Sequence, residues 1–553
     1  MIISLSIYIF TVYLPEKIDY MPVNRRRFIQ SSLIAGAGLM ISPSRAFDVK
    51  KASSLFGIHP FILQNPDAVF VMQTNIDLKT NSPAIKEAGL KFGRSVFGLT
   101  DNVENGIPLT HKVVIKPNLT CRDRTHINYT VERSMGIVTD AFFVEGIIES
   151  LKELGLASGQ FYIREVNCPD DLEDGGYLAM TERTGIDLQC INTPIAELSP
   201  DKVQWVDVPD GVCFKRIPYL WPVNAPDTFL LNIAKFKTHS MGLTLCSKNL
   251  QGTIAMNYQA HCTYYGQTMD GVNPADLSPT TDADILANYN RHKADGIPRW
   301  DKPENTGGIW QETWATRCLD NNSVIFAGLH IIEGIYGRDG NFMDGPDQDG
   351  LATDYMTNYI IFGRNQFHVD NIGHYLAGHE PANFGLFHMA KERGMASTIN
   401  PMKIKLYEWF PESGAVLADL NSLQRYPLKT SYLQRDYDGQ DESYWHMVNE
   451  PYDYGITEVN DRNSGVSNFT LQQNYPNPVQ HRTSINFQLP RNGHVLVEVL
   501  NENGNVIDVL VNNQLNGGAY SVTWNASNYP SGLYIYRLRY NGFIKVQKMI
   551  VKH

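Results

Sequence analysis

The sequence contains few cysteines and carries no net positive charge, and each of these features excludes some classes of function. The 553 residues include seven cysteines, an odd number with no Cys-x-x-Cys pair, at positions 121, 168, 190, 213, 246, 262 and 318. Zinc ribbons and ferredoxin-type iron-sulfur clusters need such pairs, so neither is expected. The formal net charge is -11, which argues against nucleic acid as a general partner.

Internal repeats are missing as well, and an adhesin built from repeated modules would need them. At 553 residues the chain is too long for one ordinary domain and can bury a large core. Its residues are 43% hydrophobic and 19% charged, a composition typical of soluble globular proteins. We therefore expect more than one folded unit.

Residues 1–46 are predicted to be an export signal. Residues 24–29 read Asn-Arg-Arg-Arg-Phe-Ile and resemble the twin-arginine motif, an apolar stretch runs from about Phe28 to Ile41, and Ser44-Arg45-Ala46 offers a cleavage site. Translation is expected to begin at Met21, which precedes this complete signal. The alternative is a membrane anchor, but about 14 weakly apolar residues are too few to span a bilayer, so no stable transmembrane anchor is expected. The resemblance implies the twin-arginine translocase as a partner.

Residues 47–450 alternate short apolar runs with amphipathic stretches. Strands are expected at Ala68 to Ile76, Lys112 to Ile115, Phe161 to Val166, Phe229 to Ile233, Ser323 to Ile332, Asn358 to Phe362 and Met402 to Trp409. Helices are expected at Pro83 to Phe97, Asp140 to Leu154 with Thr139 as its cap, Gln366 to Leu376 and Phe384 to Gly394. Strands separated by helices of this length predict an α/β fold with a mostly parallel sheet flanked by helices. Such sheets bind ligands beyond the carboxyl ends of their strands.

The stretch from Asp227 to Gly252 carries the residues of greatest chemical interest. Its apolar run, Phe229 to Ile233, is followed by Lys235, Lys237 and His239 at alternate positions, so an extended chain would project all three to one side. Three potential cations on one face repel each other, which makes sense if an anion or a carboxylate lies opposite them. The alternative is a solvated edge strand with ordinary lysines.

The same stretch resembles the signature of the family called domain of unknown function 362, whose pattern is close to K-x-K-T-H followed by K-N-x-x-G. Residues 235–239 and 248–252 supply the two parts. Further matches are a first strand with its K-P-N turn, a strand end followed by glycines, and an acidic residue opening a helix: Val113 to Leu119, Glu333-Gly334, Gly337, Gly340 and Asp370. The resemblance covers roughly residues 65 to 410. This family has no agreed reaction, and the iron-sulfur motifs of some relatives are absent from this chain.

Two functions from different classes fit these residues. The first is an extracellular enzyme acting on a small anionic substrate, with His239, Lys237 and Glu333 as candidate catalytic residues and His239 as general base or metal ligand. The candidate substrate-binding residues are Lys116, Asn118, Lys235, Lys248, Asn249, Gly252, Gly337 and Gly340. The second is a surface binding module, without chemistry, for an acidic or phosphate-bearing ligand. Either function needs Lys116, Asn118, Lys237, His239, Lys248 and Glu333 to converge in one cleft at the carboxyl edge of the sheet.

The sequence identifies no cofactor, and a divalent metal is the candidate. Imidazole and carboxylate suit several divalent ions, so His239, Asp370 and His261 are the candidate ligands. A twin-arginine signal implies export of an already folded chain, which favours a cofactor inserted before export. The alternatives are a structural histidine at 239, bonded to a backbone carbonyl, and a helix N-terminal role for Asp370.

Two segments of the α/β region lack a regular pattern. Residues 256–322, which include His261, are rich in Tyr, Trp, Asn, Gly and Pro, and are expected to be a functional lid or a small subdomain, with a surface insertion packed by its own aromatics as the alternative. The acidic residues of the segment 339–350 suggest calcium. Met343 and Gly350, however, occupy two of the ligand positions of an EF-hand loop, so a glycine-rich substrate loop is favoured.

Residues 451–467 have the composition of a linker, and residues 468–553 that of a small all-β unit. Strands are expected at Thr483 to Leu489, Val495 to Leu500, Val506 to Leu510, Tyr520 to Trp524 and Gly532 to Tyr540, a spacing that predicts an immunoglobulin-like sandwich. The unit resembles the type A C-terminal sorting domain of the type IX secretion system through Leu471 to Pro478, Gly517-Gly518, Trp524, Ser531 to Tyr534 and Lys548-Met549. This resemblance implies the type IX machinery as a partner and export through the periplasm to the surface or exterior of a Bacteroidetes-like cell.

Overall fold

The computed structural model describes most of the chain beyond the predicted signal. The described residues are 54–119, 135–166, 173, 175–191, 195–239, 242–258, 272–278, 282–298, 300–301, 309–340, 345–346, 352–431, 434–435, 446–454, 470–489, 493–501, 505–516, 518–540 and 543–553. The twin-arginine segment, His261 and most of the acidic segment 339–350 lie outside these ranges, and the predictions made for them are untested.

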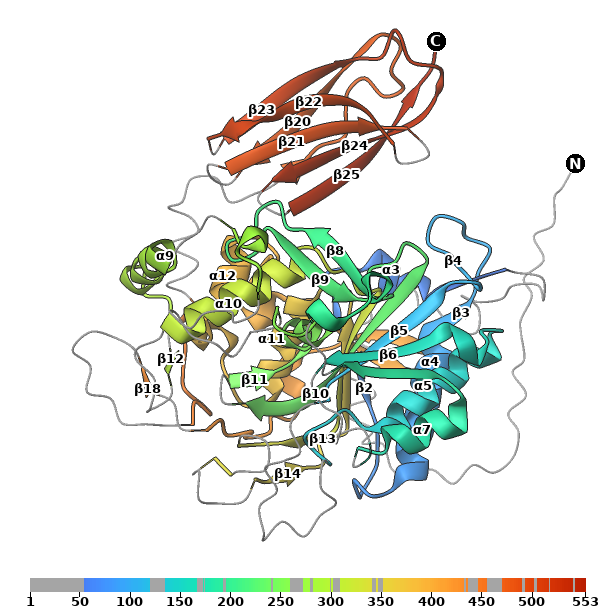
Figure 1. Cartoon of the computed structure of the whole chain (residues 1–553), viewed down its shortest axis with the longest axis vertical. Coiled ribbons are helices and arrows are strands. Elements are labelled where there is room, and N and C mark those ends of the chain that lie inside the picture. Colours follow the sequence, from blue (N-terminus) through green and yellow to red (C-terminus); the bar gives the residue numbers. More distant parts are fainter. Residues whose placement is uncertain are drawn as a thin grey trace, which may run out of the picture.

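A large mixed sheet forms the centre of the α/β region (Figure 1). Its strands are β2 (Val69–Gln73), β5 (Lys112–Pro117), β6 (Phe161–Val166), β7 (Asp187–Ile191), β10 (Thr228–His239), β11 (Gly242–Thr244), β13 (Leu329–Arg338), β14 (Asp354–Tyr355), β15 (Tyr359–Gly363), β16 (Leu406–Phe410) and β17 (Gly414–Leu417). The order is β17-β16-β2-β15-β13-β10-β5-β6-β7, with β11 paired to β10 and β14 to β13. Strands β13, β10, β5, β6 and β7 run parallel, whereas β15 is antiparallel to both neighbours. The mostly parallel sheet is confirmed.

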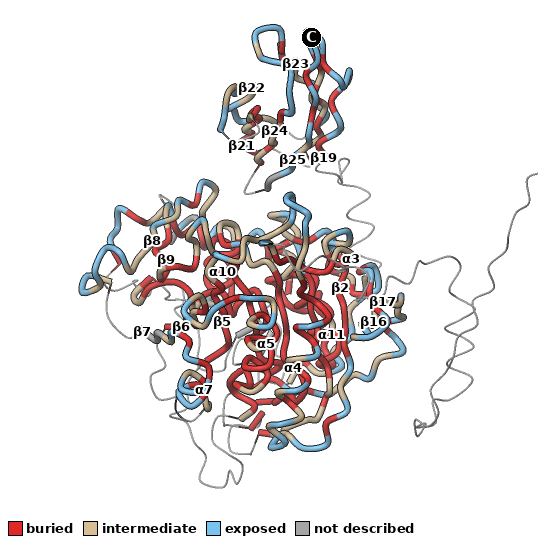
Figure 2. The backbone as a smooth tube through the Cα atoms, turned by 90° about the vertical axis from the view of Figure 1, so that its right-hand side faces the viewer, coloured by how far each residue is buried: buried red, intermediate tan, exposed pale blue. Residues whose placement is uncertain are grey.

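Helices cover both faces of this sheet (Figure 1). One layer holds α4 (Ser82–Val96), α5 (Ala141–Glu153) and α7 (Tyr177–Thr184), and the other holds α10 (Ile309–Asn322), α11 (Gln366–Leu376) and α12 (Gly385–Glu392). Side chains alternate between the faces of a strand, so Leu231 and Ile233 of β10 pack with α4 and α5, whereas Ala234 and Phe236 pack with α11. Figure 2 shows the resulting buried interior running through the sheet.

Smaller elements lie around this core. They are β1 (Leu55–Ile58), β3 (Phe97–Leu99) and β4 (Ile107–Pro108) in a small sheet, the ribbon of β8 (Val203–Asp207) and β9 (Arg216–Leu220), the pair β12 (Trp300–Asp301) and β18 (Gln434–Arg435), and the helices α3 (Pro60–Gln64), α8 (Cys246–Asn249) and α9 (Asp282–Ala294). A 3-10 turn, Leu250–Thr253, follows α8 directly.

Three sequence expectations are corrected. The segment 256–322 is not a patternless insertion, because α10 occupies its end and buries Cys318 and Leu319 completely in the core. The strand expected from Ser323 begins only at Leu329, since α10 extends to Asn322. Asp140, not Thr139, caps α5 by accepting a hydrogen bond from the Phe142 amide.

The C-terminal residues form a separate all-β unit (Figure 1). Its two antiparallel sheets contain β19 (Thr470–Leu471), β20 (Arg482–Leu489) and β23 (Gly518–Asn525), and β22 (Val506–Leu515), β21 (Gly493–Leu500), β24 (Gly532–Tyr540) and β25 (Phe543–Val551), in that order. Both sheets contribute to one apolar core, in which Trp524 and Tyr536 are fully buried. The all-β prediction is confirmed, β25 was missed, and the immunoglobulin-like topology stays a prediction.

Candidate functional site

The predicted site residues come together at the carboxyl edge of the parallel strands. In the sheet register Lys235 of β10 is opposite Glu333 of β13, Lys237 is opposite Arg338, and Lys116 of β5 is opposite Asn232. β10 has neighbours on both sides, and Lys235 and Lys237 are at most 1% exposed. The solvated edge strand considered from the sequence is therefore wrong.

Lys235 and Glu333 form an ion pair with no exposure to solvent. The Nζ atom of Lys235 lies 2.6 Å from Oε2 of Glu333 and 3.4 Å from the centroid of the Tyr336 ring. Glu333 also accepts hydrogen bonds from the backbone amides of Asp140 and Ile335. This carboxylate is the negative group that the lysine pattern required.

Burial and pairing act against each other in this ion pair. Burial lowers the pKa of Lys235 and raises that of Glu333, because each charged form has lost its water, while each partner's charge opposes the shift of the other. Asp140 adds to the shift of Glu333 through like-charge repulsion. Desolvation destabilises the charged forms of both side chains, so this buried ion pair depends on its short distance and its additional hydrogen bonds.

A second buried pair joins Lys116 to Glu165 of β6. Their Nζ and Oε2 atoms are 2.7 Å apart, and the ammonium also donates to Oδ1 of Asn249 and to the Pro117 carbonyl. Gly252 makes this arrangement possible: a Cβ at that position would lie 1.9 Å from Oε1 of Glu165. Gly252 is thus required for close backbone approach.

The two ion pairs approach the edge from different sides of the sheet and are connected by one short segment. Thr139 accepts a hydrogen bond from the Asn118 amide and donates one to the Ile233 carbonyl. The next residue, Asp140, donates its amide to Glu333 and accepts a 2.7 Å hydrogen bond from the Tyr336 hydroxyl. These contacts connect Lys116, Asn118, Lys235 and Glu333 in one network. The convergence of Lys237, His239 and Lys248 with them in one cleft stays a prediction.

Other predicted residues lie beside this network. Asn249 donates to the Lys116 carbonyl and to Asn232, and Asn118 donates to Asn249 at 3.3 Å. Lys248 precedes Asn249 on α8 and is 8% exposed. His239 ends β10, pairs in register with Gly242 of β11, and is 4% exposed.

The two glycines after Glu333 have identifiable structural reasons. A Cβ on Gly337 would lie 2.9 Å from the Phe236 carbonyl, so Gly337 permits β13 to pack closely on β10. Gly340 has a φ of 79°, and its carbonyl accepts a hydrogen bond from Thr238. Both glycines shape the end of β13, and a direct ligand contact by either one stays a prediction.

Asp370 does not open its helix as expected. Asn365 caps α11, and Asp370 lies in the second turn, where its carboxylate accepts the backbone amides of Cys246 and Ser247. Burial raises the pKa of Asp370 to about 6. Asp370 therefore caps α8 from a neighbouring helix and fixes the element that carries Lys248 and Asn249.

The described residues do not assemble the proposed metal centre. Within the described ranges, no three His, Cys, Asp or Glu side chains are grouped so as to hold an ion. The carboxylate of Asp370 is already used by two amides, and His261 lies outside the described residues. We therefore derive no chemical step from a metal.

The network also contains residues that the sequence patterns did not single out: Glu165, Asp140, Tyr336 and Asn232. Glu165 lies in the predicted strand Phe161 to Val166, where a carboxylate in an apolar run was a usable signal of burial. Asp140 and Tyr336 gave no such signal, because their contact spans 196 residues of sequence.

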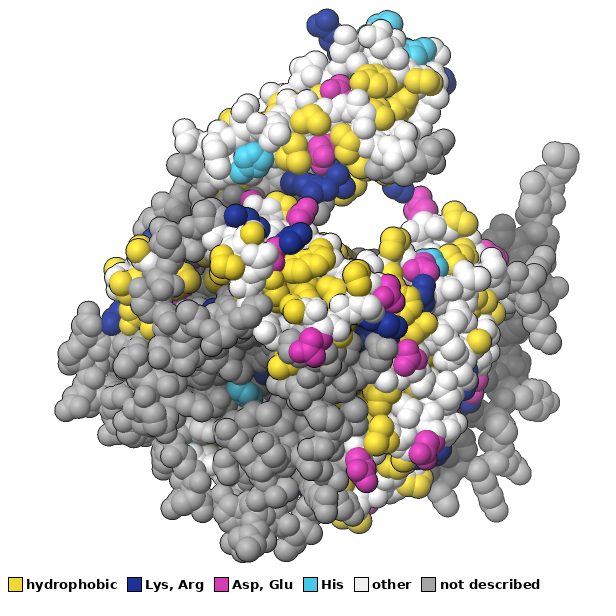
Figure 3. Space-filling view, in the orientation of Figure 1, with side chains coloured by type: hydrophobic (Ala, Val, Ile, Leu, Met, Phe, Trp, Pro, Cys, Tyr) yellow, Lys and Arg dark blue, Asp and Glu magenta, His cyan; other side chains and the backbone are white. Residues whose placement is uncertain are grey.

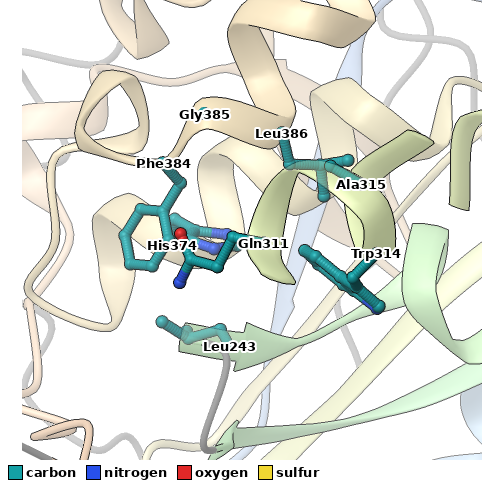
Figure 4. Close-up of a pocket in the computed structure, with 8 residues that line it drawn as sticks. All are labelled: Leu243, Gln311, Trp314, Ala315, His374, Phe384, Gly385 and Leu386. Carbon is teal, nitrogen blue, oxygen red and sulfur yellow. The ribbon is translucent and has the colours of Figure 1, made fainter. Parts of the chain in front are cut away.

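A small pocket lies beside β11, between α10, α11 and the start of α12 (Figure 4). Phe384 and His374 form one side, Trp314 lies on the other, and Leu243 lies below them. His374 bonds to the Asp370 carbonyl through Nδ1, and burial lowers its pKa to about 3. None of the lining residues is a predicted site residue, so we place the candidate site at the charged network and not in this pocket.

Two family models match the chain. Residues 113–374 match the model described as Domain of unknown function (DUF362), and residues 473–552 match the model described as Secretion system C-terminal sorting domain. The resemblances to the DUF362 family and to a C-terminal sorting domain are thereby confirmed, whereas the twin-arginine motif and the type A assignment stay predictions. No curated protein matches the chain.

Among solved structures, the dimeric latent PorU from Porphyromonas gingivalis is similar over a short part. It is 22% identical, with 15% of this chain and 9% of that chain covered and a TM-score of 0.13. The chain thus spans less than a tenth of the length of PorU, and this similarity carries no argument about fold or activity.

The sorting domain supports export to the cell surface or extracellular space and interaction with the type IX secretion machinery. Within the described ranges, no helix combines the length and the apolar character needed to cross a membrane.

Proposed function

We propose that the α/β region binds a small anionic substrate at the carboxyl edge of its parallel strands and acts on it as an exported enzyme. The observation that carries this proposal is the row of potential cations on β10, where Lys235, Lys237 and His239 are between 0% and 4% exposed. Parallel sheets bind ligands at this edge. Burying several such groups costs free energy, so a fold retains them where they serve a purpose beyond stability.

The arrangement divides the roles among these residues. Lys116 and Lys235 already have carboxylate partners within 2.7 Å, which supports a role in positioning the edge of the sheet. Ligand binding is assigned to Lys237 and Lys248, and His239 is proposed as the general base. Arg338 is held by Asp354 through its Nε atom at 2.7 Å and stays with the positioning residues.

The export route proposed for this enzyme begins with the twin-arginine signal and passes through the periplasm. Replacing Arg25 and Arg26 with Lys should leave the precursor in the cytoplasm, because lysine lacks the planar guanidinium fork. Cell fractionation measures this outcome, and normal delivery of the double variant would refute the signal assignment.

The alternative is a non-catalytic surface module that binds an acidic or phosphate-bearing ligand with the same cations. Two substitutions separate it from the enzyme. Lys237→Met should weaken binding of the probe anions phosphate and citrate about tenfold, because it deletes the charge and keeps the stem. His239→Gln should leave that binding nearly unchanged but reduce turnover by roughly 100-fold or more, in line with general acid-base contributions.

The experiment is calorimetric titration of both variants, followed by turnover assays on phosphate esters and acidic glycans. If Lys237→Met binds the anions as tightly as the natural chain, the site assignment is wrong. Binding that is intact in His239→Gln, with no turnover detected in either protein, would favour the binding module.

A further inference from the structure

Helix α9 is fastened to two other helices through one histidine. His292 is 3% exposed; its Nδ1 atom lies 2.8 Å from Oε1 of Glu312 on α10, and its Nε2 atom lies 2.8 Å from Oε2 of Glu392 on α12. Glu312 is 1% exposed. The ring therefore bridges carboxylates on two separate helices.

The Nε2 atom of His292 lies close to both a hydrogen-bond acceptor and a hydrogen-bond donor. Besides the Glu392 oxygen, it has Nη2 of Arg291 at 2.7 Å, and Arg291 also donates to Glu392 at 2.9 Å. A guanidinium can only donate a hydrogen bond, and an ionised carboxylate can only accept one. The Nε2 atom thus satisfies Glu392 when it carries a proton and satisfies Arg291 when it does not.

We propose that His292 is a pH-sensitive latch for α9. In the protonated state both ring nitrogens donate, and α9 is tied to Glu312 and Glu392 together. In the neutral state Nδ1 keeps its proton for Glu312, Nε2 accepts from Arg291, and Glu392 keeps only its bond from Arg291, so α9 loses one of its ties to α12. Imidazole is suited to this exchange because the same ring nitrogen donates a hydrogen bond when protonated and accepts one when neutral.

The groups facing the ring determine the direction of the switch. Among the described residues they include Glu312 from α10, Glu392 from α12, and Arg291 from α9 itself, and Lys293 donates to the Tyr289 hydroxyl. Two carboxylates favour the protonated ring and one guanidinium disfavours it. Acidic conditions therefore close the latch.

Helix α9 also packs through apolar side chains. The inner face of the helix presents Ile285 and Tyr289, 8% and 7% exposed, in addition to His292. The helix it is fastened to, α10, in turn contacts α8 through the hydrogen bond from Asn322 to the Ser247 carbonyl. A movement of α9 would thus be transmitted through α10 to α8, the helix that carries Lys248. The latch itself does not depend on the proposed function.

Hydrogen exchange of the full chain, compared at pH 5.5 and 8.5 after correction for intrinsic rates, tests the latch. Because the hydrogen bond from His292 to the Glu392 carboxylate is lost, protection of the α9 amides should fall about tenfold or more at the higher pH. In His292→Gln this difference should disappear. The matched control is His388→Gln on α12, a histidine bonded to the Ala382 carbonyl, which should keep the full pH difference.

A second variant covers the case in which His292→Gln opens α9 at both pH values. Glu392→Gln retains the ring and removes the ionised acceptor of Nε2, so the pH difference should again vanish. The proposal is overturned if the natural chain shows equal protection at both pH values, or if Glu392→Gln retains the full difference.

Discussion

The α/β region and the C-terminal unit bury different kinds of side chain. In the α/β region the side chains of Lys235 and Glu333 are completely buried, and those of Lys116 and Glu165 are at most 6% exposed. In the C-terminal unit the shared core is apolar, and its buried carboxylate, Glu498, pairs with Arg537, whose side chain is 21% exposed. Hydrophobic packing suffices to hold a small two-sheet unit together. The charges of the α/β region therefore point to a requirement other than stability.

The outer surfaces of the two regions do not show the difference seen between their interiors. On the face shown in Figure 3, described side chains of both charges are interspersed with apolar ones over both regions. Such a mixture of charges on this face is compatible with the negative overall charge of -11. The contrast between the regions is thus a property of their interiors.

The largest effect should follow from breaking the wholly buried pair. Lys235→Met leaves Glu333 without its cation, and removing one partner of a buried pair typically destabilises a protein by about 3–5 kcal/mol. Urea unfolding at pH 7 measures the free energy of unfolding. The double variant Lys235→Met with Glu333→Leu should recover most of the lost unfolding free energy, because it removes the unpaired carboxylate as well. If the double variant is as unstable as the single one, the unpaired charge does not explain the destabilisation.

Acid should destabilise the α/β region through its buried neutral histidines. Burial is the first cause of lowered pKa values at four of them: to about 4 for His59 and His379, and to about 3 for His330 and His374. Because the unfolded chain takes up protons near pH 6.5 and the folded chain only below these values, their stabilising contribution is complete above pH 6.5 and is lost as the pH falls.

Buried carboxyls with raised pKa values oppose this trend, among them Glu333, Asp339 and Asp370. Burial raises the pKa of Asp339 and Asp370 to about 6, so the folded chain binds their protons first and gains stability as the pH falls from 6 toward 4. With four histidines against these acids, the net result should be a loss of a few kcal/mol between pH 7 and 5. His330→Gln should reduce this loss by about 1–2 kcal/mol, as urea unfolding at the two pH values would measure. An unchanged loss would show that His330 does not titrate as inferred.

A smaller loss is expected at Gly252. In Gly252→Ala the new Cβ would meet the Glu165 carboxylate and Cε of Lys116 at 2.6 Å, so overpacking should cost about 1–3 kcal/mol. Gly159→Ala is the control, because nothing lies within 4 Å of its Cβ position. Equal unfolding free energies for the two variants would contradict the close approach described for Gly252.

The smallest effect should come from the C-terminal unit. Glu498→Gln weakens contacts with Arg537 at 2.9 Å and Arg539 at 3.3 Å, and both arginines reach solvent. Partly exposed pairs contribute about 1 kcal/mol or less. If Glu498→Gln lowered the unfolding free energy as much as Lys235→Met does, the difference described between the two regions would be contradicted.

Local patterns in the sequence predicted many elements closely. The bounds expected for β6, α11 and β24 agree with the structure, because each has a clear period and clear flanking residues. The alternation of Lys235, Lys237 and His239 also predicted an anion or a carboxylate opposite them, and Glu333 pairs with Lys235. Helix α10 was missed because it is buried on several sides and lacks a strong apolar stripe.

The sequence by itself determined the two units, the parallel strands, the sorting domain and the lysine-rich edge, because periodicity and short motifs are written in neighbouring residues. Only the tertiary structure decided the partners of the charges. Lys235 and Glu333 are 98 residues apart, and Lys116 and Glu165 are 49 apart. Asp370 caps α8 across 124 residues. Such pairings depend on which strands lie side by side and how deeply their ends are buried, and no local pattern contains that information.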